Sequence, residues 1–404
     1  MIKSVKYLLS ASLCALILLS GCTEPKQSST EATKPQVTTT LVTEPTTVAP
    51  TTTAATSDTP EEETKKYNFL AIKQKSNVID TKLKGIISDN HFQGSVYYKI
   101  GNDLEFIQST GASNEIEHKN NSIHTCYYTG SFTKQLTATA ILKLNEDGML
   151  QLDDTLEKYF KDCEYADKVT VKNLLTMTSG IPSYVQTDDK ILPEAKLADE
   201  LDGKIKKDNS AKENKSQILK WILSQKTIIE PDSNFLYSDS DYYLLGEIIE
   251  KVSGKSYSDY ISEAILKPLG MNHSGFTSVK DLAVGYSDNS EQSKLLYDNV
   301  GYSSLGFISN ISDTLKFIEG LLKESVINND SLLAMHTVYK GNFGYGVYIN
   351  GDKISISSKI DAFSTKINYV TDESEIFVAY TNYASSDASY LHSLFKKYLA
   401  EFYI

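Results

Sequence analysis

The sequence contains few of the residues, and none of the motifs, on which metal or thiol chemistry usually depends. Its 404 residues include four cysteines, six histidines and one tryptophan. Neither HExxH nor a pair of CxxC motifs occurs, so the common zinc-binding patterns are missing. The G-x-S-x-G motif of many Ser-His-Asp hydrolases is missing as well, and the histidines lie in no pattern typical of a site. We therefore expect no metal and no other cofactor.

Charge and hydropathy exclude two classes of partner for most of the chain. The net charge is −12, from 40 Lys and Arg against 52 Asp and Glu, which argues against nucleic acid as a partner. After the N-terminus no run of 18 or more apolar residues occurs, so no later segment is predicted to span a membrane. The remaining composition, 40% hydrophobic and 23% charged, is that of a globular protein with one large domain or two ordinary ones.

The first 22 residues resemble the signal peptide of a bacterial lipoprotein. Lys3 and Lys6 precede a mostly apolar run over residues 8–19, and small residues then lead to a cysteine. The segment Leu-Ser-Gly-Cys at residues 19–22 is similar to a lipobox, which implies cleavage before Cys22 and lipidation of Cys22. The alternative is an ordinary signal peptide with an incidental cysteine. We expect an exported protein, anchored through its lipid to the extracytoplasmic face of the cell membrane.

Residues 23–66 form a low-complexity segment that is rich in Thr, Pro, Ser and Glu. The segment has almost no large apolar side chains, so it cannot bury enough surface to fold. Its five prolines stiffen it into a partly extended tether. We therefore predict a disordered linker over residues 23–66 and one folded domain over residues 67–404.

The folded part has β-rich patterns at both ends and helical patterns between them. Residues 92–113 predict a hairpin that turns at Gly101-Asn102-Asp103. Residues 343–382 predict three successive strands, and residues 389–403 predict a closing helix. Between these ends, residues 241–254 predict a helix that stops at Gly254. The expected fold class is α/β, with one sheet that joins both ends of the domain and an inserted helical lobe.

The segment Gly-Ser-Phe-Thr-Lys at residues 130–134 raises the central question of function. Ser131 precedes an apolar-periodic run, so it is a good candidate for a helix N-cap, and Lys134 would then be an ordinary solvated lysine. The two residues also form a Ser-x-x-Lys motif, whose spacing places both on one face of a helix. In this second interpretation Ser131 is a nucleophile. The motif alone is weak, because Ser393 and Lys396 repeat it inside the predicted closing helix.

Segments downstream of Ser131 make the second interpretation more specific. Tyr237-Ser238-Asp239 lies just before a predicted helix, residues 174–184 read LLTMTSGIPSY, and residues 268–271 read PLGM. With these segments in this order, residues 92–382 resemble the serine β-lactamase and penicillin-binding protein group. The resemblance is to its branch of class C β-lactamases, D-alanyl-D-alanine carboxypeptidases and esterases.

The resemblance implies a β-lactamase/transpeptidase-like fold, in which helices flank an antiparallel sheet and the site lies beside an inserted helical lobe. It also implies that Ser131 attacks a carbonyl and forms an acyl-enzyme, while Lys134 and Tyr237 share the proton transfer. The helix N-terminus at Ser131 would offer a backbone N–H to the developing oxyanion. The expected partner is a small peptide, amide or ester, and a peptidoglycan-derived peptide is one candidate.

The sequence departs from this family in its third motif, which is Lys or His, any residue, then Gly. Counted back from Ala362-Phe363, the motif position holds Ile356-Ser357-Ser358, so both the cation and the glycine are missing. Asp239 replaces the Asn of the family's Tyr-x-Asn motif, and its negative charge favours a charged lysine, which is a poorer base. Lys359 lies two residues after Ser357 and is our candidate to restore the cation. The predicted substrate-binding residues are Asp239, Ser357, Ser358 and Lys359.

Two functions remain open on this basis. One is a lipid-anchored serine hydrolase, and the other is a catalytically reduced relative that binds a wall peptide or another ligand. A purely structural surface protein is a third, weaker alternative. Distances of about 2.6–3.2 Å, or somewhat more without ligand, among Ser131, Lys134 and Tyr237 would favour the hydrolase. The sequence also leaves open whether Cys126 and Cys163 form a disulfide or are buried thiols.

Overall fold

The structure is a computed structural model that describes residues 67–403, apart from 162, 188–194, 202, 207–208 and 288–299. The predicted signal peptide (residues 1–22), the linker (residues 23–66) and the lipidation of Cys22 lie outside the described residues, so they stay predictions. Within the described part of the chain, no helix combines the length and the apolar character needed to cross a membrane.

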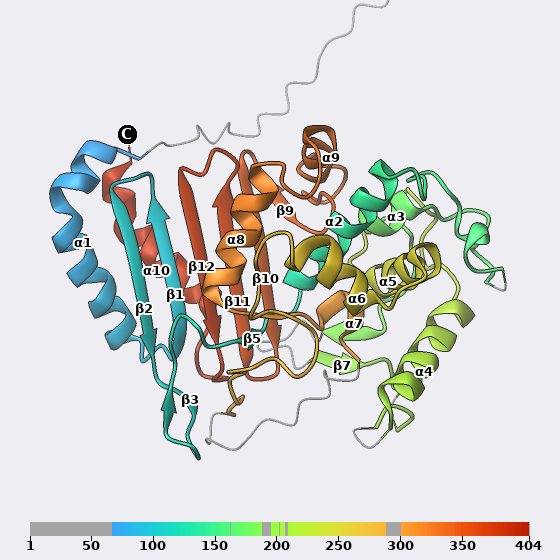
Figure 1. Ribbon diagram of the computed structural model, residues 1–404, viewed down its shortest axis with the longest axis horizontal. Coiled ribbons are helices and arrows are strands. Elements are labelled where there is room, and N and C mark those ends of the chain that lie inside the picture. Colours follow the sequence, from blue (N-terminus) through green and yellow to red (C-terminus); the bar gives the residue numbers. More distant parts are fainter. Residues whose placement is uncertain are drawn as a thin grey trace, which may run out of the picture. The chain divides into compact units, whose positions relative to one another are not determined.

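A six-stranded antiparallel sheet forms the centre of the domain (Figure 1). Its strand order is β2-β1-β12-β11-β10-β9, so the first and last strands of the chain pair with each other. The strands are β1 (Gly94–Ile100), β2 (Leu104–Thr110), β9 (Tyr348–Asn350), β10 (Lys353–Ile360), β11 (Phe363–Val370) and β12 (Glu375–Thr381). This arrangement confirms the α/β fold, the N-terminal hairpin and the three C-terminal strands, and β9 is an additional short strand.

Six short strands form three further two-stranded sheets, which pair as β3-β4, β5-β8 and β6-β7. They are β3 (Ala112–Asn114), β4 (Lys119–Asn120), β5 (Tyr127–Tyr128), β6 (Val185–Thr187), β7 (Ala195–Leu197) and β8 (Ile308–Ser309). The β5-β8 pair matters for the site, because β5 ends at Tyr128 and leads the chain directly to Ser131.

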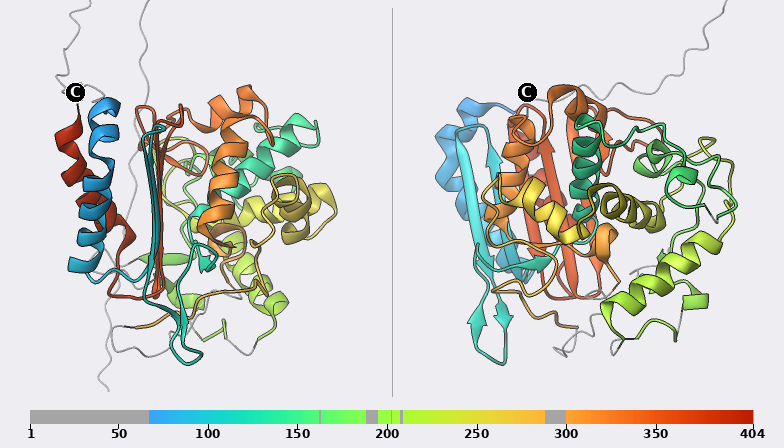
Figure 2. Two further views of the ribbon diagram at one scale, coloured as in Figure 1. Left: turned by 60° about the vertical axis from the view of Figure 1, so that its left-hand side comes forward. Right: turned by 45° about the vertical axis from the view of Figure 1, so that its right-hand side comes forward.

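Helices from the two ends of the domain cover one face of the central sheet (Figure 2). They are α1 (Phe69–Asp89) and α10 (Ala388–Leu399). Leu83 of α1 and Phe395 of α10 share a buried apolar cluster with Phe106 and Phe377 of the sheet. The helix α10 confirms the predicted closing helix. We did not predict α1, whose few buried apolar residues are separated by many polar ones.

The other helices lie on the opposite face and beside the sheet (Figures 1 and 2). They are α2 (Phe132–Glu146), α3 (Val171–Leu175), α4 (Ala211–Ser224), α5 (Asp239–Ser253), α6 (Tyr257–Ile261), α7 (Tyr302–Leu305), α8 (Ile311–Leu322) and α9 (Asn329–Met335). The predicted helix over residues 241–254 is confirmed by α5, which ends at Gly254, a residue with φ of +70°.

The helix α2 is central to this lobe, because it contacts both β10 and α5. Twelve of its 15 residues are buried. A helix that is buried on all sides is usually apolar, yet α2 buries Thr133, Lys134 and Gln135 in its first turn. Buried polar groups need partners, and the partners of Lys134 form the candidate site.

Candidate active site

Ser131 occupies the N-cap position of α2, but its hydroxyl does not cap the helix. The Ser131 Oγ instead lies 3.0 Å from the phenolic oxygen of Tyr237, and the serine is partly exposed. The helix-cap interpretation of this hydroxyl is therefore wrong. The side chain is directed at another candidate catalytic residue, as the nucleophile interpretation requires.

Gly130 explains how the start of α2 comes so close to the sheet. Its φ is +55°, a conformation that side chains rarely adopt. A Cβ at this position would collide with the hydroxyl of Ser358 and would lie 2.6 Å from Cδ1 of Ile360. Only glycine therefore allows the N-terminus of α2 to contact β10 without displacing it.

Lys134 is buried one turn further along α2, with 1% of its side chain exposed. Its Nζ donates to Asp239 Oδ1 at 2.6 Å and to the carbonyl of Ser304 at 3.1 Å. The distance from Nζ to Ser131 Oγ is longer, 3.5 Å. The alternative of a solvated helix lysine is therefore wrong. The three predicted catalytic residues converge, and these distances favour the hydrolase hypothesis.

Asp239 begins α5 and is the charged partner of Lys134. It is 5% exposed, and the hydroxyl of Ser304 donates to the same Oδ1 at 2.5 Å. Its backbone N–H donates to Ser183 Oγ at 3.0 Å, and the start of a helix also favours a carboxylate. These contacts hold Lys134 in place, so we assign Asp239 a positioning role in place of the predicted contact with substrate.

Sequence reasoning missed two of these supporting residues. Ser183 belongs to the segment at residues 174–184, which served only to identify the family resemblance. Ser304 lies in α7, which was not predicted. Nothing in the sequence indicates that Ser304 contacts Lys134, because 170 positions separate them and only the folded lobe brings them together.

Two opposing effects act on the pKa of Lys134. Burial lowers this pKa, whereas the Asp239 carboxylate and, to a smaller extent, Tyr237 raise it, and the pKa is raised overall. Lys134 is therefore an ammonium group at neutral pH and is not available to take a proton from Ser131. Tyr237 is the group in hydrogen-bond contact with the Ser131 hydroxyl.

Strand β10 directs two residues of the third-motif region toward α2. Ile356 is 3% exposed and belongs to the apolar core on that side of the sheet. Ser358 lies against Gly130, beside the candidate nucleophile. Because β9 pairs with β10 only up to Ser355, residues 356–360 keep β11 as their only strand neighbour within the described chain. This part of β10 is therefore an open strand edge beside the start of α2.

The other two predicted substrate-binding residues of β10 lie on the opposite face of the sheet. Side chains alternate along a strand, so Ser357 and Lys359 point away from α2. The Ser357 hydroxyl accepts a hydrogen bond from Lys366 Nζ at 3.0 Å, and Lys359 Nζ donates to the carbonyl of Ala384 at 3.4 Å. The prediction that Lys359 restores the cation is wrong, because its side chain lies on the opposite face of the sheet from Ser358 and from α2.

An aromatic rim borders Tyr237. The Phe343 ring lies 6.4 Å from the Tyr237 ring, and Phe235 and Tyr348 pack against Phe343 at 5.4 and 5.0 Å. Tyr348 is 39% exposed, so part of the rim faces solvent. These residues were not predicted to belong to the site. The rim gives the neighbourhood of the nucleophile an apolar character.

The cysteines of the domain give no support to a thiol mechanism. Cys126 is buried, and burial raises the pKa of its thiol to about 12, which leaves little thiolate at neutral pH. Cys163 is buried as well, and no disulfide joins the two. Across the described residues, no cluster of three or more His, Cys, Asp or Glu side chains could hold a metal ion.

Comparisons with known proteins agree with this geometry. The Beta-lactamase family profile matches residues 96–390. The chain is 27% identical over 335 residues to a Bacillus subtilis (strain 168) protein named "Putative penicillin-binding protein PbpX", covering 80% of this chain and 79% of that protein. It is 30% identical over 219 residues to Protein flp of Staphylococcus aureus (strain COL), covering 52% of this chain but only 40% of Protein flp.

A solved structure extends the likeness to three dimensions. The penicillin-binding protein from Bacillus halodurans is similar with a TM-score of 0.67 at 26% identity, covering 78% of this chain and 98% of that one. The profile match runs from β1 into α10 and includes the candidate site residues Ser131, Lys134 and Tyr237. The chain therefore belongs to the β-lactamase family, among the serine hydrolases related to penicillin-binding proteins.

Proposed function

We propose that the protein hydrolyses its substrate through an acyl-enzyme on Ser131. The observation that carries this proposal is the 3.0 Å contact between Ser131 Oγ and Tyr237 OH, with the buried Lys134 beside them. Burying an ion pair is expensive unless its geometry is good, and a protein that only binds a ligand would not need such a pair beneath a partly exposed serine. The hydrolase is therefore favoured over the binding module.

The contacts suggest a role for each group in acylation. Ser131 Oγ attacks the carbonyl carbon while Tyr237 takes the hydroxyl proton and passes its own phenolic proton to the departing alcohol or amine. Lys134 stays protonated, and its positive charge stabilises the negative charge that develops during the attack. A water molecule then hydrolyses the ester formed on Ser131 by the same proton transfers in reverse, which restores the enzyme.

The substrate we propose is an ester or amide that is recognised without a carboxylate. The position at which the family resemblance implies a cation holds the buried Ile356, and the ammonium of Lys134 is already paired with Asp239. The aromatic rim next to Tyr237 favours an apolar group on the acyl side. A small peptide, including one derived from peptidoglycan, would have to bind through its backbone, for which the open edge of β10 offers N–H and carbonyl groups.

We further propose that the domain acts outside the cell membrane, held by a lipid on Cys22. The support is the order of charges, apolar residues and small residues in residues 1–22, followed by the tether over residues 23–66. In a bacterial host, Cys22→Ser should shift the protein from the membrane fraction to the soluble fraction. Retention of the variant in the membrane fraction would contradict the lipid anchor.

The acyl-enzyme is tested by intact-mass measurement of the full chain after exposure to a fluorophosphonate and, separately, to penicillin. We expect one fluorophosphonate adduct, which disappears in Ser131→Ala and persists in Ser393→Ala, the matched change in the second Ser-x-x-Lys copy. We expect little penicillin adduct, because the carboxylate-binding cation is missing. A folded protein that acquires no adduct from the fluorophosphonate would establish the binding module instead.

A further inference from the structure

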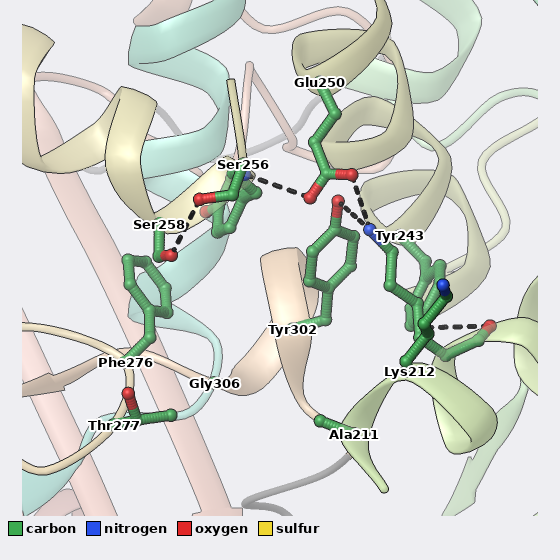
Figure 3. A pocket seen from close by; sticks show the side chains of 12 residues that line it. Ala211, Lys212, Tyr243, Glu250, Ser256, Ser258, Phe276, Thr277, Tyr302 and Gly306 are labelled. Carbon is green, nitrogen blue, oxygen red and sulfur yellow. Dashed lines mark hydrogen bonds and ion pairs between the residues drawn. The ribbon is translucent and has the colours of Figure 1, made fainter. Parts of the chain in front are cut away.

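A second cavity lies in the helical lobe, apart from the Ser131 site (Figure 3). Its volume is about 230 Å³, and none of the three candidate catalytic residues lines it. Four aromatic side chains form its walls, with neighbouring rings 4.9–5.1 Å apart. These are Tyr243, Tyr257, Phe276 and Tyr302. Aromatic walls favour a ligand with a flat ring, which can stack on one wall and meet another edge-on.

The charged groups in the deep part of the cavity are already compensated. Lys215 Nζ lies 2.6 Å from Glu250 and 3.0 Å from Glu247, and it sits 4.3 Å above the Tyr302 ring. The second oxygen of Glu250 accepts the backbone N–H of Tyr257 at 3.0 Å. A cationic ligand is therefore disfavoured, because the Lys215 ammonium already covers the face of the Tyr302 ring and both oxygens of Glu250 already have partners.

The cavity lining also carries a positive charge that no described residue compensates. Lys212 lines the cavity from the first turn of α4, is exposed, and forms no hydrogen bond or ion pair with any other described residue. The neighbouring Glu213 is engaged in a capping box, in which it accepts hydrogen bonds from Ser210 at 2.7 Å. Hydroxyl groups of Ser258 and Thr277 lie on the same lining. The Ser258 hydroxyl is already paired with that of Ser256 at 3.2 Å, so Lys212 and Thr277 are the groups on this lining that suit an anion.

We propose that this cavity is a binding site for a small aryl carboxylate, whose ring lies between the aromatic walls and whose carboxylate pairs with Lys212. An apolar cavity of about 150 Å³ holds a benzene ring, so about 230 Å³ accommodates a bicyclic ring. For a ligand of roughly a dozen heavy atoms we expect a Kd of about 0.1–1 mM.

The proposed site and the Ser131 site share the helix α7. Tyr302 begins this helix with φ of +40° and forms a wall of the cavity. Ser304, two residues later, accepts the hydrogen bond from Lys134 through its carbonyl. A ligand that stacks on Tyr302 thus contacts the same short helix that positions the buried lysine.

The test is isothermal titration calorimetry of the full chain with indole-3-acetate as probe. The parent protein carries Ser131→Ala, so that neither acylation nor a failure of the proposed hydrolase affects the result. We expect Ala211→Trp, at an exposed position on the cavity lining, to abolish binding. If Ala211→Trp does not fold, Thr277→Trp also places an indole in the cavity and should abolish binding in the same way. Lys212→Met should weaken binding about three- to tenfold, whereas Lys220→Met, an exposed lysine elsewhere on α4, should not.

A neutral analogue of the probe distinguishes the contribution of the ring to the affinity from the contribution of the carboxylate. Tryptophol has the same ring and an alcohol in place of the carboxylate, so we expect it to bind more weakly than indole-3-acetate and to be insensitive to Lys212→Met. Equal affinity of the two probes would overturn the role of Lys212. Binding that survives in a folded Ala211→Trp or Thr277→Trp variant would overturn the location, and no binding at several millimolar would overturn the site itself.

Discussion

The chemistry of the site depends on how a single lysine is shared between two partners. Lys134 Nζ lies 2.6 Å from Asp239 and 3.5 Å from Ser131, so the carboxylate and not the nucleophile is its closest partner. The pair is almost completely buried, and in such surroundings an unpaired charge is strongly unfavourable. Asp239 therefore keeps Lys134 charged, which in the proposed mechanism leaves Tyr237 to take the proton of Ser131.

Replacing Asp239 by Asn should change the charge state of Lys134. Without the carboxylate, burial lowers the pKa of the lysine and nothing of equal strength raises it, so more free amine is present at pH 7. The free amine can take the proton of Ser131 itself, and we expect this gain to exceed the loss of the stabilising positive charge. Fluorophosphonate labelling of Ser131 should therefore accelerate about tenfold at pH 7, and the rising part of its pH–rate profile should move to lower pH. The measurement is the pseudo-first-order labelling rate between pH 6 and pH 10.

Asp241 provides the matched control for this change. It lies two residues later in α5, is fully buried, and accepts its hydrogen bond from Ser179 at 2.6 Å without touching Lys134. Asp241→Asn should leave the labelling profile unchanged. An identical profile in wild type and Asp239→Asn would show that the carboxylate does not set the protonation state of Lys134.

The contact between α2 and β10 shows how one helix end is fitted to a strand. Gly130 precedes the helix and lies against Ser358 and Ile360 of the strand, whereas Gly148 follows the helix with φ of +71° and has no neighbour within 4 Å of an added Cβ. Both glycines have left-handed backbones, but only Gly130 is also enclosed. A comparison of substitutions at Gly130 and Gly148 therefore distinguishes the effect of backbone strain from that of steric collision.

We predict that Gly130→Ala is much more damaging than Gly148→Ala. The change at Gly148 should lower the free energy of unfolding by about 1 kcal/mol through backbone strain alone. The change at Gly130 adds the collision with β10 and should cost about 2–4 kcal/mol in total, with at least tenfold slower labelling of Ser131. Urea unfolding and labelling kinetics check both parts. Equal losses in the two variants would contradict a tight fit between α2 and β10.

Local patterns in the sequence predicted the main strands, two helices and the pairing of Ser131 with Lys134 on one helical turn. The N-terminal hairpin, the last three strands, α5 and α10 follow from periodicity and turn residues, and the spacing of Ser131 and Lys134 is a property of one helical turn. The prediction for Lys359 failed because a strand's periodicity shows which side chains share a face, but not which face meets the lobe. That choice is made by the packing of β10 against α2, which nothing local to residues 353–360 encodes.

In the domain as a whole, the first and last described residues lie on the face of the sheet opposite the Ser131 site. Tyr67, the first described residue, bridges to Tyr403 beside α1 and α10, on the face of the sheet opposite α2. Its hydroxyl also accepts a hydrogen bond from Lys396 at 2.8 Å. The described chain therefore begins and ends on the face of the sheet that α1 and α10 cover.

Two partly buried histidines should make the fold sensitive to acid. Burial lowers the pKa of His336 to about 4 and, together with nearby lysines, that of His392 to about 3. Both are neutral in the fold, whereas in the unfolded chain each takes up a proton below its ordinary pKa of about 6.5. The unfolded state then binds more protons, so stability is complete above about pH 6.5 and falls as the pH decreases toward 4 and 3.

We expect the free energy of unfolding to fall by about 2–4 kcal/mol between pH 7 and pH 5 through these two groups. The double variant His336→Gln, His392→Leu should lose most of this dependence, whatever its stability at pH 7. His124→Gln, at an exposed position, should keep it. Guanidinium unfolding at half-unit pH intervals gives the slope for each protein. If the double variant retained the wild-type slope, the acid sensitivity would have to arise from the carboxylates, and the histidines would be protonated in the fold at an ordinary pH.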